Sequence, residues 1–137
     1  GARFLGTILK NNIGLTSLDL SNCKLYPEGM AALSEPIRSS VNLQSVNLGE
    51  NIIGEKGSVY LSTMFLNATC LDRLDLNLNV LCKEGGKNIV ALIKTCTHLS
   101  SLHLMHNNIP EKIRAEIKKN ASHRLKNKIR FQTLTLY

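Results

Sequence analysis

The segment Leu15-Thr16-Ser17-Leu18-Asp19-Leu20-Ser21-Asn22-Cys23-Lys24-Leu25 decides the fold of this 137-residue chain, because its pattern returns three times. Further copies run from Leu43 to Ile53, from Leu71 to Leu81 and from Leu99 to Ile109, each starting 28 residues after the one before. All four read LxxLxLxx(N/C)x(L/I), and Val46 is the one exception at a leucine position. A fixed period of about 20–50 residues indicates a repeat architecture.

The second half of each unit also repeats, and it predicts a helix. Two apolar positions four residues apart recur in every unit, a spacing that places both side chains on one face of a helix. Each unit is therefore predicted to consist of a short strand, a turn, a loop and an amphipathic helix. The two positions are held by Leu5 and Leu9, Leu33 and Ile37, Leu61 and Phe65, and Ile89 and Ile93.

The 28-residue strand-plus-helix unit resembles the ribonuclease-inhibitor-like class of leucine-rich repeats. Cysteine at the asparagine position of the first copy and a glycine in the helical half (Gly1, Gly29, Gly57, Gly85) are part of that resemblance. It implies an α/β solenoid, with a curved parallel β-sheet on the concave side and α-helices on the convex side. Related arrays occur in nucleotide-binding immune sensors, Ran GTPase-activating proteins, tropomodulins and ciliary scaffolds.

We expect a single domain over residues 1–137. Residues 111–130 belong to a unit that is four residues longer than the period. Apolar residues continue at a four-residue spacing to Ile129, and four residues are about one helical turn. An extended basic helix, or two short helices hinged near Asn120, is therefore expected there. Both ends are expected to be cut from a longer array or covered by neighbouring subunits. The expected parts are the helical half of a preceding repeat at 1–14, full repeats at 15–42, 43–70 and 71–98, a last repeat at 99–130 and a terminal strand at 131–137.

Buried asparagines are expected to hold the turns. The side-chain amides of Asn51, Asn79 and Asn107 are predicted to satisfy backbone groups of adjacent units in a ladder. Cys23 takes the same buried position in the first full unit. Pro36 lacks the N–H that a regular helix needs, so its helix is expected to end near Glu35 or to kink, as the most irregular convex segment.

The net charge of +7 is concentrated in residues 111–130, which hold eight Lys or Arg and two Glu. A solvated face of the terminal helix is one interpretation, because cations also complement a helix C-terminus. An acidic protein or a membrane surface is the alternative partner of this segment. No base-stacking aromatics or nucleic-acid-binding motif accompany the basic residues, which argues against nucleic acid. No apolar run approaches the ~20 residues of a membrane-spanning helix.

The four cysteines, Cys23, Cys70, Cys82 and Cys96, show neither CxxC nor zinc-finger spacing. The disulfide-rich caps usual in secreted leucine-rich repeats are not evident, so reduced thiols and an intracellular, cytoplasmic location are expected. No Walker loop and no GxGxxG motif are present, and no histidine has partners at metal-ligand spacing. We therefore predict no cofactor and no metal.

The predicted concave face carries columns of polar residues, because residues alternating with buried leucines point outward. Asp75 and His103 are expected to be lateral neighbours within hydrogen-bonding reach. A catalytic use would need Ser45 or Ser101 as nucleophile, on a flat face with no elbow or oxyanion nest, so we interpret the pair as a surface ion pair. The columns are Ser17, Ser45, Arg73, Ser101 and Thr133; Asp19, Asn47, Asp75, His103 and Thr135; and Ser21, Gly49, Asn77, Met105 and Tyr137.

A non-enzymatic interaction module or scaffold that binds another protein through its curved surface is the predicted function. Residue types that commonly anchor interfaces gather toward the C-terminal half of the columns. The alternatives are a GTPase regulator resembling Ran GTPase-activating proteins, a tropomodulin-like actin-end capping domain, and the sensing array of an immune receptor. The partner-binding candidates are Arg73, Asp75, Leu78, His103, Met105 and Tyr137.

Overall fold

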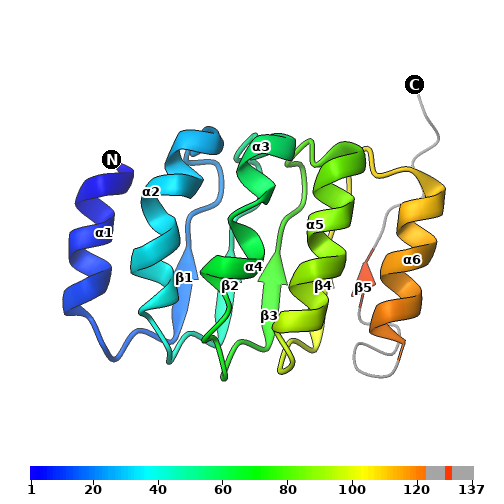
Figure 1. Ribbon diagram of the computed structural model, residues 1–137. Helices are drawn as coiled ribbons and strands as arrows, with labels where there is room; N and C mark the ends of the chain where they lie inside the picture. Colours follow the sequence, from blue (N-terminus) through cyan, green and yellow to red (C-terminus); the bar gives the residue numbers. More distant parts are fainter. Residues whose placement is uncertain (123–128, 131–137) are drawn as a thin grey trace.

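A computed structural model describes residues 1–122 and 129–130, and over these residues the chain forms one parallel β-sheet covered on one face by helices (Figure 1). The strands follow one another in sequence order across the sheet. This order arises because each unit advances by the same strand-to-helix path. The strands are β1 (Ser17–Asp19), β2 (Ser45–Asn47), β3 (Arg73–Asp75), β4 (Ser101–His103) and β5 (Ile129–Arg130).

The helices stand in a row on one side of the sheet (Figure 1). Their inward side chains come from the two apolar positions that recur in every unit, and Leu33, Leu61 and Ile89 are completely buried. Sheet, helices and pattern together make an α/β leucine-rich-repeat solenoid, as predicted. The helices are α1 (Ala2–Asn11), α2 (Tyr26–Arg38), α3 (Gly54–Ser58), α4 (Leu61–Met64), α5 (Cys82–Thr95) and α6 (Glu111–Ala121).

The strand register reproduces the sequence period. Leu18 is paired with Val46, Val46 with Leu74, and Leu74 with Leu102, so equivalent residues stand side by side. All four side chains are buried between sheet and helices. Burial of one such side chain contributes roughly 1.5–3 kcal/mol, and a single unit could not supply the walls that bury it.

The predicted asparagine ladder is confirmed. The Nδ2 of Asn79 donates to the carbonyl of Leu48 in the preceding unit (2.8 Å) and to that of Leu76 in its own unit (3.1 Å). Its Oδ1 accepts from the backbone N–H of Asn51 (3.0 Å). Asn51 and Asn107 are likewise buried and reach back in the same way. Adjacent turns are thus tied to one another by buried side-chain amides.

Cys23 is exposed, contrary to the prediction that it is buried. Its N–H donates to the Oδ1 of Asn51 (2.9 Å), so the backbone of this turn is held as in the others. The side chains of the later asparagines reach the turn before them, whereas no turn precedes Cys23 within the described residues.

The prediction that the helix ends near Glu35 is wrong, because α2 passes through Pro36 and ends at Arg38. Close to the helix end the missing N–H removes one bond only. The ring is buried, and its Cγ lies 2.9 Å from the point that a Cβ on Gly6 would occupy, so proline packs against a glycine of α1. The irregular convex segment is instead residues 54–64, where two short helices, α3 and α4, stand in place of one.

Of the two expectations for residues 111–130, a single extended helix is wrong, because α6 ends at Ala121, next to the hinge expected near Asn120. Residues 123–128, where a second short helix was expected, lie outside the described residues. Ile129, which fits a helical spacing, lies in β5 and is paired with Leu102, 27 residues before it. A four-residue apolar spacing fits a strand as well as a helix, and the backbone edge of β4 provides the hydrogen-bonding partner that decides between them. Leu125 and the predicted strand at 131–137 lie outside the described residues.

We expect Asn79→Ala to lower the free energy of unfolding by roughly 3 kcal/mol or more. The substitution leaves the buried N–H groups of Asn51 and Ile53 without their acceptor, and each such loss costs about 1–3 kcal/mol. Urea denaturation followed by circular dichroism measures the effect. The control is Asn120→Ala at an exposed site of α6, where a change within about 0.5 kcal/mol is expected. Equal effects of the two substitutions would contradict a ladder role.

Candidate functional site

The face of the sheet that the helices leave uncovered, called the open face below, is the predicted concave side. The structure confirms the first two columns as far as β4, because Ser17, Ser45, Arg73 and Ser101 stand in register, as do the residues two positions later. A shallow groove of about 260 Å³ follows these columns. Thr133, Thr135 and Tyr137 lie outside the described residues.

The second column has a structural role that the sequence analysis missed. Its Asp and Asn side chains fold back onto the backbone two residues later, a turn that is typical of these two residue types. The acceptor oxygens are therefore partly committed to ending the strand. The bonds run from Ser21 N to Asp19 Oδ1 (2.9 Å), from Gly49 N to Asn47 Oδ1 (2.9 Å) and from Asn77 N to Asp75 Oδ1 (2.8 Å).

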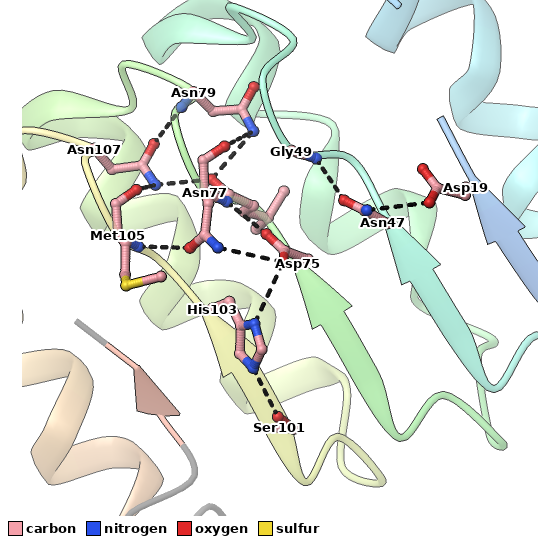
Figure 2. A network of polar contacts seen from close by, with 11 residues as sticks. Asp19, Asn47, Gly49, Asp75, Asn77, Asn79, Ser101, His103, Met105 and Asn107 are labelled. Atoms are coloured by element: carbon pink, nitrogen blue, oxygen red, sulfur yellow. Dashed lines mark hydrogen bonds and ion pairs between the residues drawn. The ribbon is translucent and has the colours of Figure 1, made fainter. Parts of the chain in front are cut away.

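The fourth unit breaks this series, because His103 stands where the others have Asp or Asn. The N–H of Met105 donates instead to the Oδ1 of Asn77 in the neighbouring unit (2.7 Å). The His103 side chain therefore makes no bond to its own turn and instead contacts Asp75 on the neighbouring strand. Figure 2 shows this change of partners along the open face.

Asp75, His103 and Ser101 form a connected row on the open face (Figure 2). The Nδ1 of His103 lies 3.3 Å from the Oδ2 of Asp75, which confirms the predicted lateral contact. The Nε2 of the same ring lies 3.4 Å from the Oγ of Ser101. The imidazole therefore bridges a carboxylate and a hydroxyl through its two nitrogens, and all three residues are half-buried.

The other candidates lie around this row. Arg73 is exposed, and its Nε is 3.7 Å from the Oδ2 of Asp72, a distance at which an exposed pair contributes little. Leu78 is 44% exposed, and its N–H donates to the carbonyl of Met105 (2.9 Å). The structure thus gathers five of the six predicted partner-binding residues on β3, β4 and the turns that follow them.

The turns beyond the open face carry an apolar cluster that the sequence analysis recognised only at Leu78. Ile52 and Val80 are 51% and 44% exposed. Both have left-handed backbone angles, φ 53° and φ 54°, which are rare for β-branched residues. We call Ile52, Leu78 and Val80 the turn cluster. The sequence did not reveal the exposure of Ile52 and Val80, because the variable positions of the repeat do not indicate which way a side chain points.

The predicted basic segment is described only in part. In α6, Ile113 and Ile117 are buried, and Arg114 is paired with Glu111. Lys112 and Lys119 are exposed on the same helix. Arg124, Lys126 and Lys128 lie outside the described residues, so a partner surface at 111–130 stays a prediction.

Within residues 1–122 and 129–130, no three His, Cys, Asp or Glu side chains gather in a metal-binding arrangement. The helices described here are all too short or too polar to cross a bilayer.

Comparison with known families gives one match. A family model described as "Leucine Rich repeat" matches residues 11–34 and 95–109, which contain β1 and β4 with their turns. No curated protein matches the chain. The family match supports a leucine-rich-repeat protein, in agreement with the fold.

We expect the Asp19 carboxyl to have a pKa below its ordinary range, and we expect Ser21→Ala to raise this pKa. The backbone N–H of Ser21 lowers the pKa most, and the Ser21 hydroxyl and the amide of Asn47 lower it further. A depressed carboxyl pKa contributes stability above the unfolded-state pKa, and this stability is lost as the pH falls through the folded-state pKa. NMR titration of the carboxyl carbon measures the shift. Ser17→Ala is the control, and equal Asp19 pKa values in the two variants would disprove the assignment.

Proposed function

We propose that this leucine-rich-repeat array is a non-enzymatic module that binds a partner protein across its open face and the adjoining turn cluster. Leucine-rich repeats generally mediate protein–protein interaction. The observation that carries the proposal is the turn cluster, where three large apolar side chains are exposed in the turns that follow β2 and β3, two of the strands that line the polar groove. An apolar centre with a polar surround is the usual anatomy of a protein interface.

Backbone strain supports a binding role for Ile52 and Val80. A β-branched residue in the left-handed region costs about 1–2 kcal/mol relative to a residue that tolerates it. The equivalent positions of the first and fourth turns hold Lys24 and Asn108, with φ 51° and φ 53°. Asparagine visits this region more readily, so stability alone would favour it in all four turns. Aliphatic side chains in the two middle turns are therefore better explained by contact with a partner.

The neighbouring polar residues complete the proposed interface. Arg73 presents an exposed guanidinium, a group that often anchors protein contacts. Met105 is half-buried beside the Leu78 turn and offers an adaptable apolar surface. Asp75 and His103 contribute a fixed acceptor and an orientable ring. Together these residues define one patch across β3, β4 and their turns.

A photo-crosslinking amino acid at position 78 should capture the partner, whereas the same group at position 59 should not. Val59 is 53% exposed, as accessible as Leu78, but it lies between α3 and α4 on the helix side. The measurement is the yield of covalent adducts in cells, resolved by mass. Adducts of equal mass and yield from both positions, or from position 59 alone, would contradict docking at the turn cluster.

Val80→Asn should stabilise the fold and weaken partner binding at the same time. Removal of the strained β-branched residue is expected to raise the free energy of unfolding by about 1 kcal/mol. The loss of an exposed apolar side chain should reduce the crosslinking yield from position 78. Thermal denaturation and adduct yield measure the two effects. The control, Asn108→Val, should lose stability; a Val80→Asn variant that binds as well as the unmodified protein would exclude Val80 from the interface.

A further inference from the structure

We infer that Ser101 is an activated nucleophile on the open face, which accepts an acyl group from small activated esters. The row Ser101–His103–Asp75 gives the serine a base and gives that base an orienting carboxylate (Figure 2). This inference goes beyond the proposed docking function, because binding a partner does not require a reactive hydroxyl.

The two ring nitrogens of His103 face the groups that nucleophilic catalysis needs. Nε2 lies 3.4 Å from the Ser101 Oγ and can take its proton, while Nδ1 lies 3.3 Å from the Asp75 Oδ2. A carboxylate at Nδ1 holds the neutral ring in the tautomer that leaves Nε2 free to accept. Both distances are longer than the roughly 2.6–3.2 Å of an engaged pair, and such contacts often tighten only when a substrate is bound.

The surrounding strands hold this row in place. Ser101 and His103 are two residues apart on β4 and therefore point to the same face of the sheet. Asp75 stands directly beside His103 in the register. Its carboxylate accepts hydrogen bonds from the backbone N–H of Asn77 (2.8 Å) and from the Asn77 Nδ2 (3.3 Å). Reacting groups on paired strands keep their relative positions without a loop closure.

A cation and a small groove accompany the nucleophile. Arg73 is paired in register with Ser101, and its exposed guanidinium has only a long contact with Asp72. It is therefore available to stabilise the negative charge that develops on a carbonyl oxygen during attack. The groove of about 260 Å³ is lined by Ser101, His103 and Arg73, among others, and its size suits a small acyl group.

The reaction with p-nitrophenyl acetate shows which bonds form and which bonds break. The Oγ of Ser101 forms a bond to the carbonyl carbon as its proton passes to the Nε2 of His103. The bond from that carbon to the p-nitrophenolate oxygen then breaks, and the proton leaves with the nitrophenol or to water. The product is an acetyl ester of Ser101, and neither oxidant nor reductant is needed.

The chain contains its own control serines. Ser45 and Ser17 occupy the same column as Ser101, but Asn47 and Asp19 stand where Ser101 has His103. We expect p-nitrophenyl acetate to acetylate Ser101 at least about tenfold faster than Ser45 or Ser17, as measured by acid quenching and mass spectrometry of peptides. Equal rates at the three serines, or acetylation of His103 without transfer to Ser101, would overturn the inference.

Two variants test the row without disturbing the fold. His103→Gln should slow acetylation of Ser101 by roughly 100-fold, at the lower end of what a positioned general base contributes. Asp75→Asn should slow it by about tenfold or more, and its fold is protected because Asn47 makes the same turn bond in the neighbouring unit. Ser39→Ala, at the end of α2 on the helix side of the sheet, should leave the rate at Ser101 unchanged. Circular dichroism confirms folding of each variant, and an unchanged rate in folded His103→Gln would refute the role of the base.

Discussion

Backbone groups at the turns of this solenoid are buried, and only the adjacent turn can satisfy them. The amide of Asn79 connects carbonyls of its own and the preceding unit, while its oxygen accepts N–H groups of that preceding unit. This interaction is local in space but spans a whole repeat along the chain. It fixes the register of adjacent turns, because a strand shifted along its neighbour would place its asparagine away from these groups. The packing of the leucines then follows from that register.

The same constraint shapes the surface. With the leucines of β1 to β4 facing the helices, the residues between them must face outward in columns. Asp and Asn in the second column terminate the strands by bonding to the backbone, so part of the polar surface is structural. His103 departs from this use, and Asn77 replaces it as acceptor for Met105. One substitution in a repeated position thus creates both an imidazole that contacts Asp75 and Ser101 and a hydrogen bond from Met105 to the neighbouring unit.

Binding and reactivity are proposed for neighbouring but different groups. The turn cluster is apolar and strained, which is consistent with selection for contact over stability. The row on β3 and β4 is polar and held by strand pairing. Both lie on units two to four, where the exposed positions deviate most from a plain repeat. Deviations at exposed positions point to function, because the fold of the repeat does not depend on which residues occupy these positions.

The sequence by itself determined these features of the repeat: the strand and helix order, the parallel register, the buried leucines, the asparagine ladder and the proximity of Asp75 to His103. Periodicity carries this information because equivalent residues must meet equivalent neighbours. The tertiary structure alone decided what occurs once. It set the exposure of Cys23, which has no preceding turn over it in the described residues, and the packing of Pro36 against Gly6. It also placed Ile129 in a strand, because the edge of β4 supplied backbone partners that no spacing in the sequence reveals. The contact of Ser101 with the second nitrogen of His103 depends likewise on a side-chain rotation, which a pattern of residue types cannot specify.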